Sequence, residues 1–215
     1  MLLSSSRYST ECFLEKRRLF LDSCVLIDWA DDPQLDELFE QVESNFCLIF
    51  CTLSILEVGF GPRGGLSPNQ VTRAGNIYDL AFQNPIDNDS LRNTENFLPS
   101  NRVAYNPNHH EWYAARTSLL RLIDKTKRKV KNTRGLANDA VIYSCAWNAR
   151  AAIISNNLKD FVLLNRLTVP QKTSDGHLRH VPVFTIQDLK ESLTKEVSYP
   201  ENIPSNLSSP NGFDH

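Results

Sequence analysis

Four acidic side chains lie at comparable places along the sequence, each beside a short apolar run. They are Asp22, Glu57, Asp139 and Asp160. If the fold brings them together they repel one another, by about 4 kcal/mol for two charges about 4 Å apart at an effective dielectric constant of about 20. Cations would have to offset this repulsion, and an all-oxygen set of ligands favours Mg²⁺ or Mn²⁺ over zinc. The chemistry that such ions commonly serve is phosphoryl transfer.

Each acid also has an ordinary structural explanation. Asp22 follows an apolar run and is a typical N-cap for the next helix. Ser54 and Glu57 have the spacing of a capping box. Asp139 would lie in the first turn of a helix, where the helix dipole favours an acid, and Asp160 would be a further N-cap. Both interpretations stay open for each acid taken alone, so the case for chemistry depends on their joint placement.

Short apolar runs alternate with amphipathic segments along the chain. A run such as 46–51 is continuous in its apolar character, which is typical of a parallel strand buried on both faces. The spacing of Leu35, Leu38, Phe39 and Val42 indicates one face of a helix. The predicted strands are 18–22, 46–51, 152–155 and 181–186, and the predicted helices are 25–30, 34–44, 52–60, 71–82, 110–125, 137–150, 161–166 and 187–193. This order predicts an α/β fold with a central parallel sheet flanked by helices.

Such a fold would gather the four acids at one edge of the sheet. Asp22 and Asp160 follow predicted strands, Glu57 lies in the helix after the second strand, and Asp139 opens a helix that leads into the next. The carboxyl ends of parallel strands share an edge, where functional groups of open α/β folds gather. We therefore expect the carboxyl groups of Asp22, Glu57 and Asp139 around a common cavity.

The ends of the chain and one internal stretch differ from this pattern. Residues 1–17 are polar and predict an N-terminal arm, residues 18–194 form the domain, and residues 195–215, rich in Pro, Ser and Asn, predict a disordered tail. Residues 61–108 are predicted to be an insertion. Within it, residues 84–108 show little hydrophobic periodicity and contain many asparagines. We expect that part to be a surface excursion rather than a core element.

Composition narrows the class of protein. The 215 residues carry 23 Lys and Arg against 25 Asp and Glu, so overall charge indicates no partner. The five cysteines include no CxxC pair, which favours a reduced, cytoplasmic protein. We expect no secretory leader and no membrane association, because no apolar window is long enough for either.

Four segments carry a resemblance to a known family. They are 21–27 (LDSCVLI), 53–61 (LSILEVGFG), 138–142 (NDAVI) and 153–161 (IISNNLKDF). Their order and spacing over residues 18–190 resemble the PIN-domain family and, within it, the toxin ribonucleases of VapBC type. The resemblance implies a PIN-like three-layer fold and a metal-dependent endoribonuclease, the toxin of a toxin–antitoxin pair.

The resemblance also implies roles for individual residues. Asp22, Glu57 and Asp139 would be ligands of Mg²⁺ or Mn²⁺, with Asp160 as the fourth acid and metal ligand. Ser23 and Ser155 would orient ligands and waters by hydrogen bonds, and Asn157 would be a third supporting residue. Many family members have an acid where this chain has Asn157, which suggests a weaker site for a second metal. The candidate partners are an RNA substrate, a cognate antitoxin protein and a second copy of the chain in a homodimer.

Other functions have less support. A phosphatase of the haloacid dehalogenase type needs an acid where this chain has Cys24, and the sequence holds no GxGxxG or GxxxxGK[ST] motif. The adjacent His109, His110 and Glu111 are more typical of a helix start than of a metal site. The main alternative is a non-catalytic PIN-like module that binds RNA or serves as a scaffold; loss of one of the four acids would be its hallmark, and all four are present.

A basic run precedes Asp139. It includes Lys127, Arg128, Lys129 and Lys131. These residues could follow the phosphates of RNA, giving affinity that depends on salt and not on sequence. A solvated helix end explains the same run, and both interpretations remain open at this point.

Overall fold

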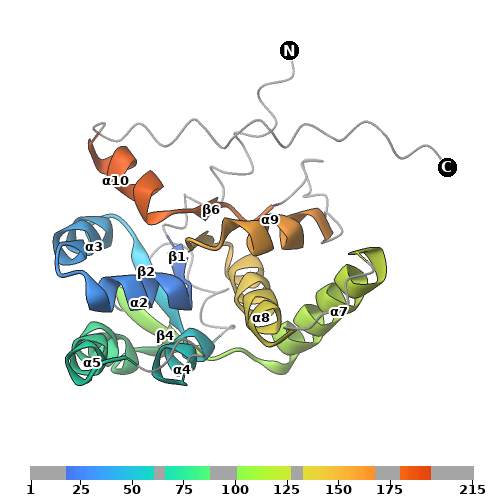
Figure 1. Cartoon of the computed structure of the whole chain (residues 1–215), viewed down its shortest axis with the longest axis horizontal. Helices are drawn as coiled ribbons and strands as arrows, with labels where there is room; N and C mark the ends of the chain where they lie inside the picture. The colour runs from blue at the N-terminus through green and yellow to red at the C-terminus, as the bar shows by residue number, and fades with distance from the viewer. Residues whose placement is uncertain (1–17, 61–65, 88–100, 127–132, 168–179, 195–215) are drawn as a thin grey trace, which may run out of the picture.

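The structure is a computed structural model that describes residues 18–60, 66–87, 101–126, 133–167 and 180–194. Within these ranges six strands form one sheet in the order β3-β4-β2-β1-β5-β6, and every pairing is parallel (Figure 1). The strands are β1 (Arg18–Leu21), β2 (Cys47–Cys51), β3 (Pro85–Ile86), β4 (Arg102–Tyr105), β5 (Ala152–Ile154) and β6 (Val183–Phe184). The predicted fold class, a parallel sheet flanked by helices, is confirmed.

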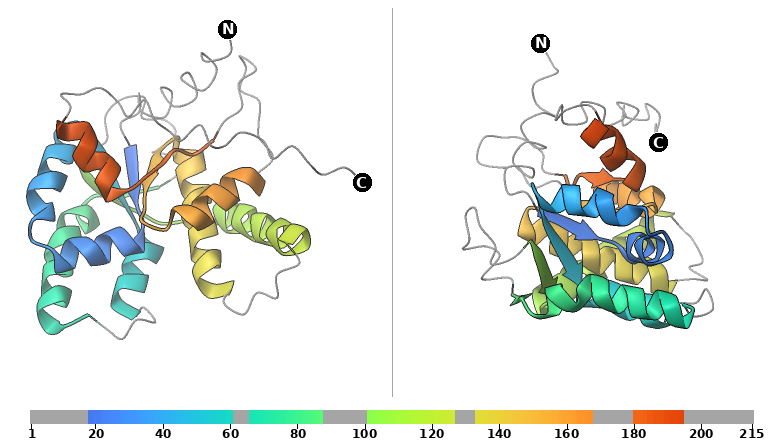
Figure 2. Two further views of the ribbon diagram at one scale, coloured as in Figure 1. Left: turned by 45° about the horizontal axis from the view of Figure 1, so that its top comes forward. Right: turned by 90° about the vertical axis from the view of Figure 1, so that its left-hand side faces the viewer.

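Helices cover both faces of this sheet (Figure 2). One layer consists of α2 (Ser23–Asp31), α3 (Leu35–Glu43), α5 (Pro68–Phe82) and α10 (Ile186–Thr194). The other consists of α7 (His109–Thr126), α8 (Thr133–Ala149) and α9 (Leu158–Leu167). The short helix α4 (Thr52–Phe60) follows β2 directly and contributes apolar side chains to both layers.

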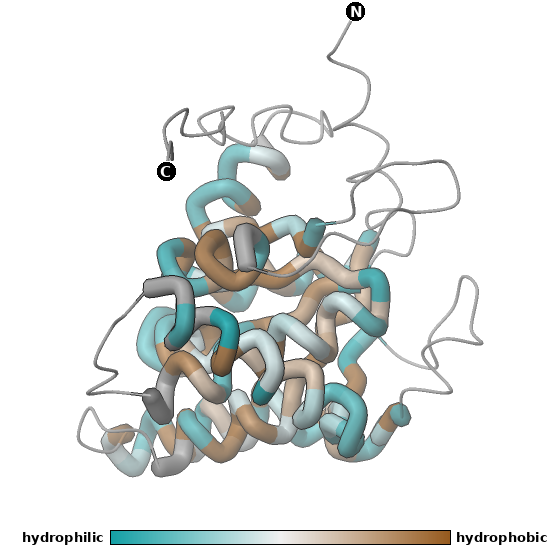
Figure 3. Tube along the Cα trace, turned by 90° about the vertical axis from the view of Figure 1, so that its right-hand side faces the viewer, coloured by the Kyte–Doolittle hydropathy of each residue, from teal (hydrophilic) through white to brown (hydrophobic). Residues whose placement is uncertain are grey.

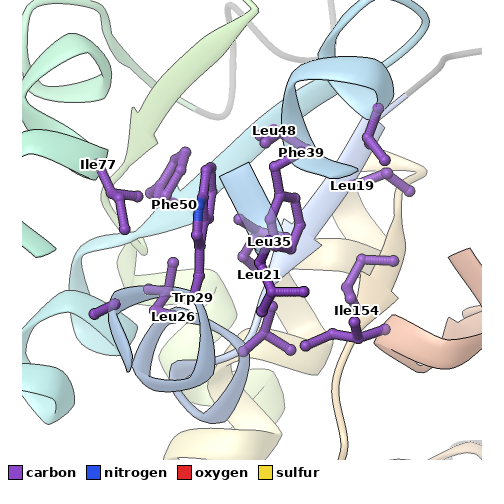
Figure 4. Packing of buried hydrophobic residues seen from close by; sticks show 14 of the residues in the cluster. Leu19, Leu21, Leu26, Trp29, Leu35, Phe39, Leu48, Phe50, Ile77 and Ile154 are labelled. Carbon is purple, nitrogen blue, oxygen red and sulfur yellow. The ribbon is translucent and has the colours of Figure 1, made fainter. Parts of the chain in front are cut away.

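Strand side chains alternate between the two layers. On β1, Leu19 and Leu21 face the layer that contains α2, and Phe20 faces the layer that contains α8. In the first layer the Trp29 ring stacks on Phe39, with ring centroids 4.0 Å apart (Figure 4). Burial on both faces is the physical reason why the strands are apolar throughout rather than alternating.

Three helices begin at least three residues earlier than predicted. The helix α5 begins at Pro68 because Ser67 caps it: the Ser67 hydroxyl accepts from the Gln70 backbone N–H (3.3 Å) and the Gln70 side chain accepts from the Ser67 N–H (2.7 Å). The helices α8 and α9 begin at Thr133 and Leu158. The prediction that Asp139 lies in the first turn of its helix is therefore wrong.

The prediction that residues 84–108 form a surface excursion is wrong for the described stretches 84–87 and 101–108. The short strands β3 and β4 continue the sheet beyond β2, and Val103 and Tyr105 are fully buried. The Tyr105 ring makes an edge contact with Phe20 of β1, with centroids 5.6 Å apart. Residues 88–100 between the two strands lie outside the described residues, as do the predicted arm and tail.

The helices are amphipathic, as expected of helices that bury one face. Viewed from the side on which α7 lies, hydrophobic and hydrophilic residues alternate along the helices (Figure 3). No helix in the described part of the chain is long and apolar enough to cross a membrane.

Candidate functional site

Asp22 lies at the carboxyl end of the central strand β1. It is the N-cap of α2, so one oxygen, Oδ1, accepts from the Ser23 backbone N–H at 2.7 Å. The other, Oδ2, accepts from the Ser155 hydroxyl at 2.7 Å and from the Cys24 thiol at 3.1 Å. Asp22 is only 2% exposed. The predicted N-cap role and the predicted support from Ser155 are thus both present, whereas the Ser23 hydroxyl makes only a long contact of 3.4 Å.

Asn157 connects three of the four acids. Its backbone N–H donates to the Ser155 hydroxyl at 2.9 Å, and that hydroxyl in turn donates to Asp22. Its side-chain amide donates to Asp139 Oδ2 at 3.1 Å and to Asp160 Oδ2 at 3.0 Å. Asp139 comes from α8 and Asp160 from the first turn of α9, so two helices joined through β5 meet at this amide.

Glu57 of α4 is the fourth acid. Its Oε1 accepts a hydrogen bond from the side-chain amide of Asn138, the residue before Asp139. The alternative interpretation of Ser54 and Glu57 as a capping box does not hold, because α4 begins at Thr52 and Ser54 lies inside it. Figure 2 (left) shows α2, α4, α8 and α9 around the same end of β1. We name Asp22, Glu57, Asp139 and Asp160 the acid cluster.

The acids interact electrostatically. The pKa of Asp139 is raised from 3.8 to about 8, first by burial and then by the negative charges of Asp22, Asp160 and Glu57, in that order. Asp139 is 7% exposed, so little water screens these charges. Without a bound cation, Asp139 therefore holds a proton near neutral pH.

The ligand chemistry of the acid cluster fits a hard divalent ion. Carboxylate oxygens are the ligands that Mg²⁺ and Mn²⁺ prefer, and the excess negative charge favours a cation. Among the described residues, no three His, Cys, Asp or Glu side chains already form a metal-coordinating group.

Sequence reasoning missed two neighbours of the acid cluster. Asn138 opens the motif segment 138–142, but its contact with Glu57 joins residues 81 positions apart, and no local sequence pattern predicts such a contact. Cys24 donates its thiol hydrogen to Asp22, and burial followed by the Asp22 charge raises the pKa of that thiol to about 12. Cys24 is therefore a neutral donor that helps to orient Asp22.

A further buried acid, Glu111, lies outside the acid cluster and belongs to a structural network. Its Oε2 accepts from the Asn108 N–H at 2.8 Å, and Asn108 Oδ1 accepts from the Glu111 N–H at 3.2 Å, which is a capping box for α7. The Tyr105 hydroxyl also donates to Glu111 Oε1. The prediction that His109, His110 and Glu111 open a helix is confirmed.

Ser54 of α4 is fully buried, and its hydroxyl has no hydrogen-bond partner in the described structure. A buried polar group without a partner costs stability. We expect Ser54→Ala to raise the free energy of unfolding by about 1 kcal/mol, because it removes this hydroxyl and leaves little empty space. Urea unfolding of both proteins measures the change.

Ser144 of α8 provides the matched control. It is also buried, but its hydroxyl donates to the Ala140 carbonyl at 2.8 Å. We expect Ser144→Ala to give no gain. Equal losses in the two variants would contradict the interpretation that the Ser54 hydroxyl lacks a partner.

The sequence matches no protein-family model, and no curated protein matches it. Similar solved structures include a DNA-bound VapBC complex from Salmonella typhimurium, with 10% identity and a TM-score of 0.47 over 79% of this chain and 98% of that chain. VapBC2 from Rickettsia felis, bound to a promoter DNA fragment, is similar with 11% identity and a TM-score of 0.47 over 78% of this chain and 98% of that chain.

Proposed function

We propose that this chain is a metal-dependent endoribonuclease that hydrolyses phosphodiester bonds of RNA. The observation that supports this proposal most is the meeting of four acids from β1, α4, α8 and α9 at one end of the central strand. Hydrogen bonds through Ser155, Asn157 and Asn138 hold all four in place. If these acids served only as helix caps, there would be no reason for acids from separate elements to lie at one location.

Asp22, Glu57, Asp139 and Asp160 are the residues that would hold Mg²⁺ or Mn²⁺. A bound ion would activate a water molecule and neutralise charge on the phosphate. The protein's own part is to orient the carboxylates: Ser155 and Cys24 fix Asp22. Asn138 fixes Glu57, and Asn157 fixes the other two acids. Such supporting hydrogen bonds commonly set ligand geometry in metal sites.

Metal dependence tests the proposal directly. We expect the purified protein to cleave single-stranded RNA in Mg²⁺ or Mn²⁺, to stop in excess EDTA, and to recover when Mn²⁺ is added back. Gel analysis of a labelled RNA measures the cleavage. Cleavage that continues in EDTA would contradict the metal mechanism, and a protein that binds RNA without cutting it in any metal would favour the non-catalytic module.

A finer proposal is that the chain is the toxin of a toxin–antitoxin pair. It rests on the order and spacing of the four motifs that resemble VapBC-type ribonucleases. An antitoxin protein is then the candidate partner, and a homodimer the candidate assembly. The most direct observation is whether a small adjacent reading frame encodes a DNA-binding protein that blocks cleavage when added to the nuclease.

Lys127, Arg128, Lys129 and Lys131 lie outside the described residues. They follow α7 in the sequence and precede α8, the helix that carries Asp139. Their proposed contact with RNA phosphates thus remains a prediction based on sequence alone.

A further inference from the structure

Asn157 lies between two carboxylates that would otherwise face each other. Its side-chain nitrogen is 3.1 Å from Asp139 Oδ2 and 3.0 Å from Asp160 Oδ2. An amide nitrogen carries two hydrogens, so each carboxylate receives one. In the opposite orientation the amide carbonyl oxygen would face both acids, and a single proton on Asp139 could bridge only one of the two contacts, whereas the donor orientation satisfies both. The two contacts therefore fix the amide as a donor.

The amide acts on the pair in the way that a small cation would. It brings two partially positive hydrogens between two acids without adding a net charge. Each acid keeps its other oxygen, and among the described residues no hydrogen bond occupies Oδ1 of Asp139 or of Asp160. These two oxygens are therefore among those that could bind an ion.

We propose that Asn157 is a positioning residue whose amide takes the place of a second cation, so that the acid cluster binds a single divalent ion. This inference rests on the proposed metal-dependent function. An Asp at this position would have the same shape but would present an oxygen where the amide presents hydrogens. Three carboxylates would then converge, and a cation would have to replace the lost hydrogen bonds.

The test is the number of ions that the folded protein binds. Mn²⁺ binding is measured by calorimetry, and by electron paramagnetic resonance of free and bound Mn²⁺. We expect a single Mn²⁺ per chain in the wild type and a second in Asn157→Asp. Asn157→Ala, which removes the donors without adding an acceptor, should keep a single ion with weaker affinity. A purely structural role would leave the count the same in all three proteins.

Asn156→Asp is the matched control, because it adds the same charge one residue away. The Asn156 amide donates to Asp28 at 2.6 Å and does not lie between Asp139 and Asp160. We expect this variant to keep the wild-type ion count. A second ion in Asn156→Asp would overturn the inference, because added charge alone would then explain the gain.

Thermal unfolding in EDTA gives a second readout that needs no metal. In EDTA, Asn157→Asp should melt at a lower temperature than Asn157→Ala, since it loses the same hydrogen bonds and gains a charge. When Mn²⁺ is then added, the melting temperature of Asn157→Asp should rise more than that of Asn157→Ala. An Asn157→Asp protein as stable as the wild type in EDTA would overturn the inference.

The failures of the two proposals are distinguishable. A wild type that binds two ions, or an Asn157→Asp variant that gains none, overturns the inference and leaves the metal-dependent function standing. A wild type that binds no divalent ion overturns the proposed function and this inference with it. The wild-type count does not depend on whether any variant folds.

Discussion

Asp22→Asn is expected to lower RNA cleavage by more than about 100-fold, because loss of a ligand should exceed the roughly 10–100-fold cost of losing a residue that only supports one. Asp22 ends the central strand and has a hydrogen bond to each oxygen, so the substitution keeps the shape while removing the charge. Mn²⁺ affinity should fall together with cleavage. Initial rates on a labelled RNA and calorimetric titration with Mn²⁺ measure the two effects.

Asp188→Asn is a suitable control for loss of a hydrogen-bonded acid. Asp188 also accepts a backbone N–H and a hydroxyl, both from Thr185 at 2.7 Å, but it lies in α10, away from the acid cluster. This variant should keep its cleavage rate even if it loses some stability. If Asp22→Asn cleaved as fast as Asp188→Asn, the role of Asp22 as a ligand would be refuted.

The central strands were predictable because their signal is local. Burial on both faces demands a continuous apolar run, and β1 and β2 both have one. The strand β4 was missed because Arg102–Tyr105 is only four residues long and follows a stretch rich in Asn and Pro. Its strand state depends on pairing with β2 and β3, which is a tertiary contact that sequence periodicity does not record.

The candidate site was predictable to the extent that strand ends reveal it. The positions of Asp22 and Asp160 follow from the order of strands and helices, since parallel strands share a carboxyl edge. Asn157 is among the predicted supporting residues, but its two contacts were not predictable, because they depend on how α8 and α9 pack together. The spacing of Ser54 and Glu57 suggested a capping box as an alternative, but the helix begins two residues before Ser54, which local spacing does not reveal.

Asp139→Asn is expected to stabilise the metal-free protein at about pH 8 by a few kcal/mol, since each unit of pKa shift corresponds to about 1.4 kcal/mol. The folded state raises the pKa of Asp139 from 3.8 to about 8, so between these values the folded chain binds more protons than the unfolded chain. Stability of the wild type in EDTA should therefore fall as pH rises through this window. Asn does not titrate, so the variant should lack this contribution.

Urea unfolding in EDTA at about pH 5 and about pH 8 measures the effect, because the linkage predicts a gap between the two proteins that widens with pH. Near the lower pH the wild-type carboxyl is protonated in the folded state and most of the repulsion is absent. Adding Mn²⁺ at the higher pH should stabilise the wild type and have much less effect on Asp139→Asn, because ligand binding stabilises only the state that binds it. Parallel pH profiles in EDTA would show that Asp139 is charged in the folded protein at neutral pH. The electrostatic link between Asp139 and the other acids would then be too weak to attract a cation.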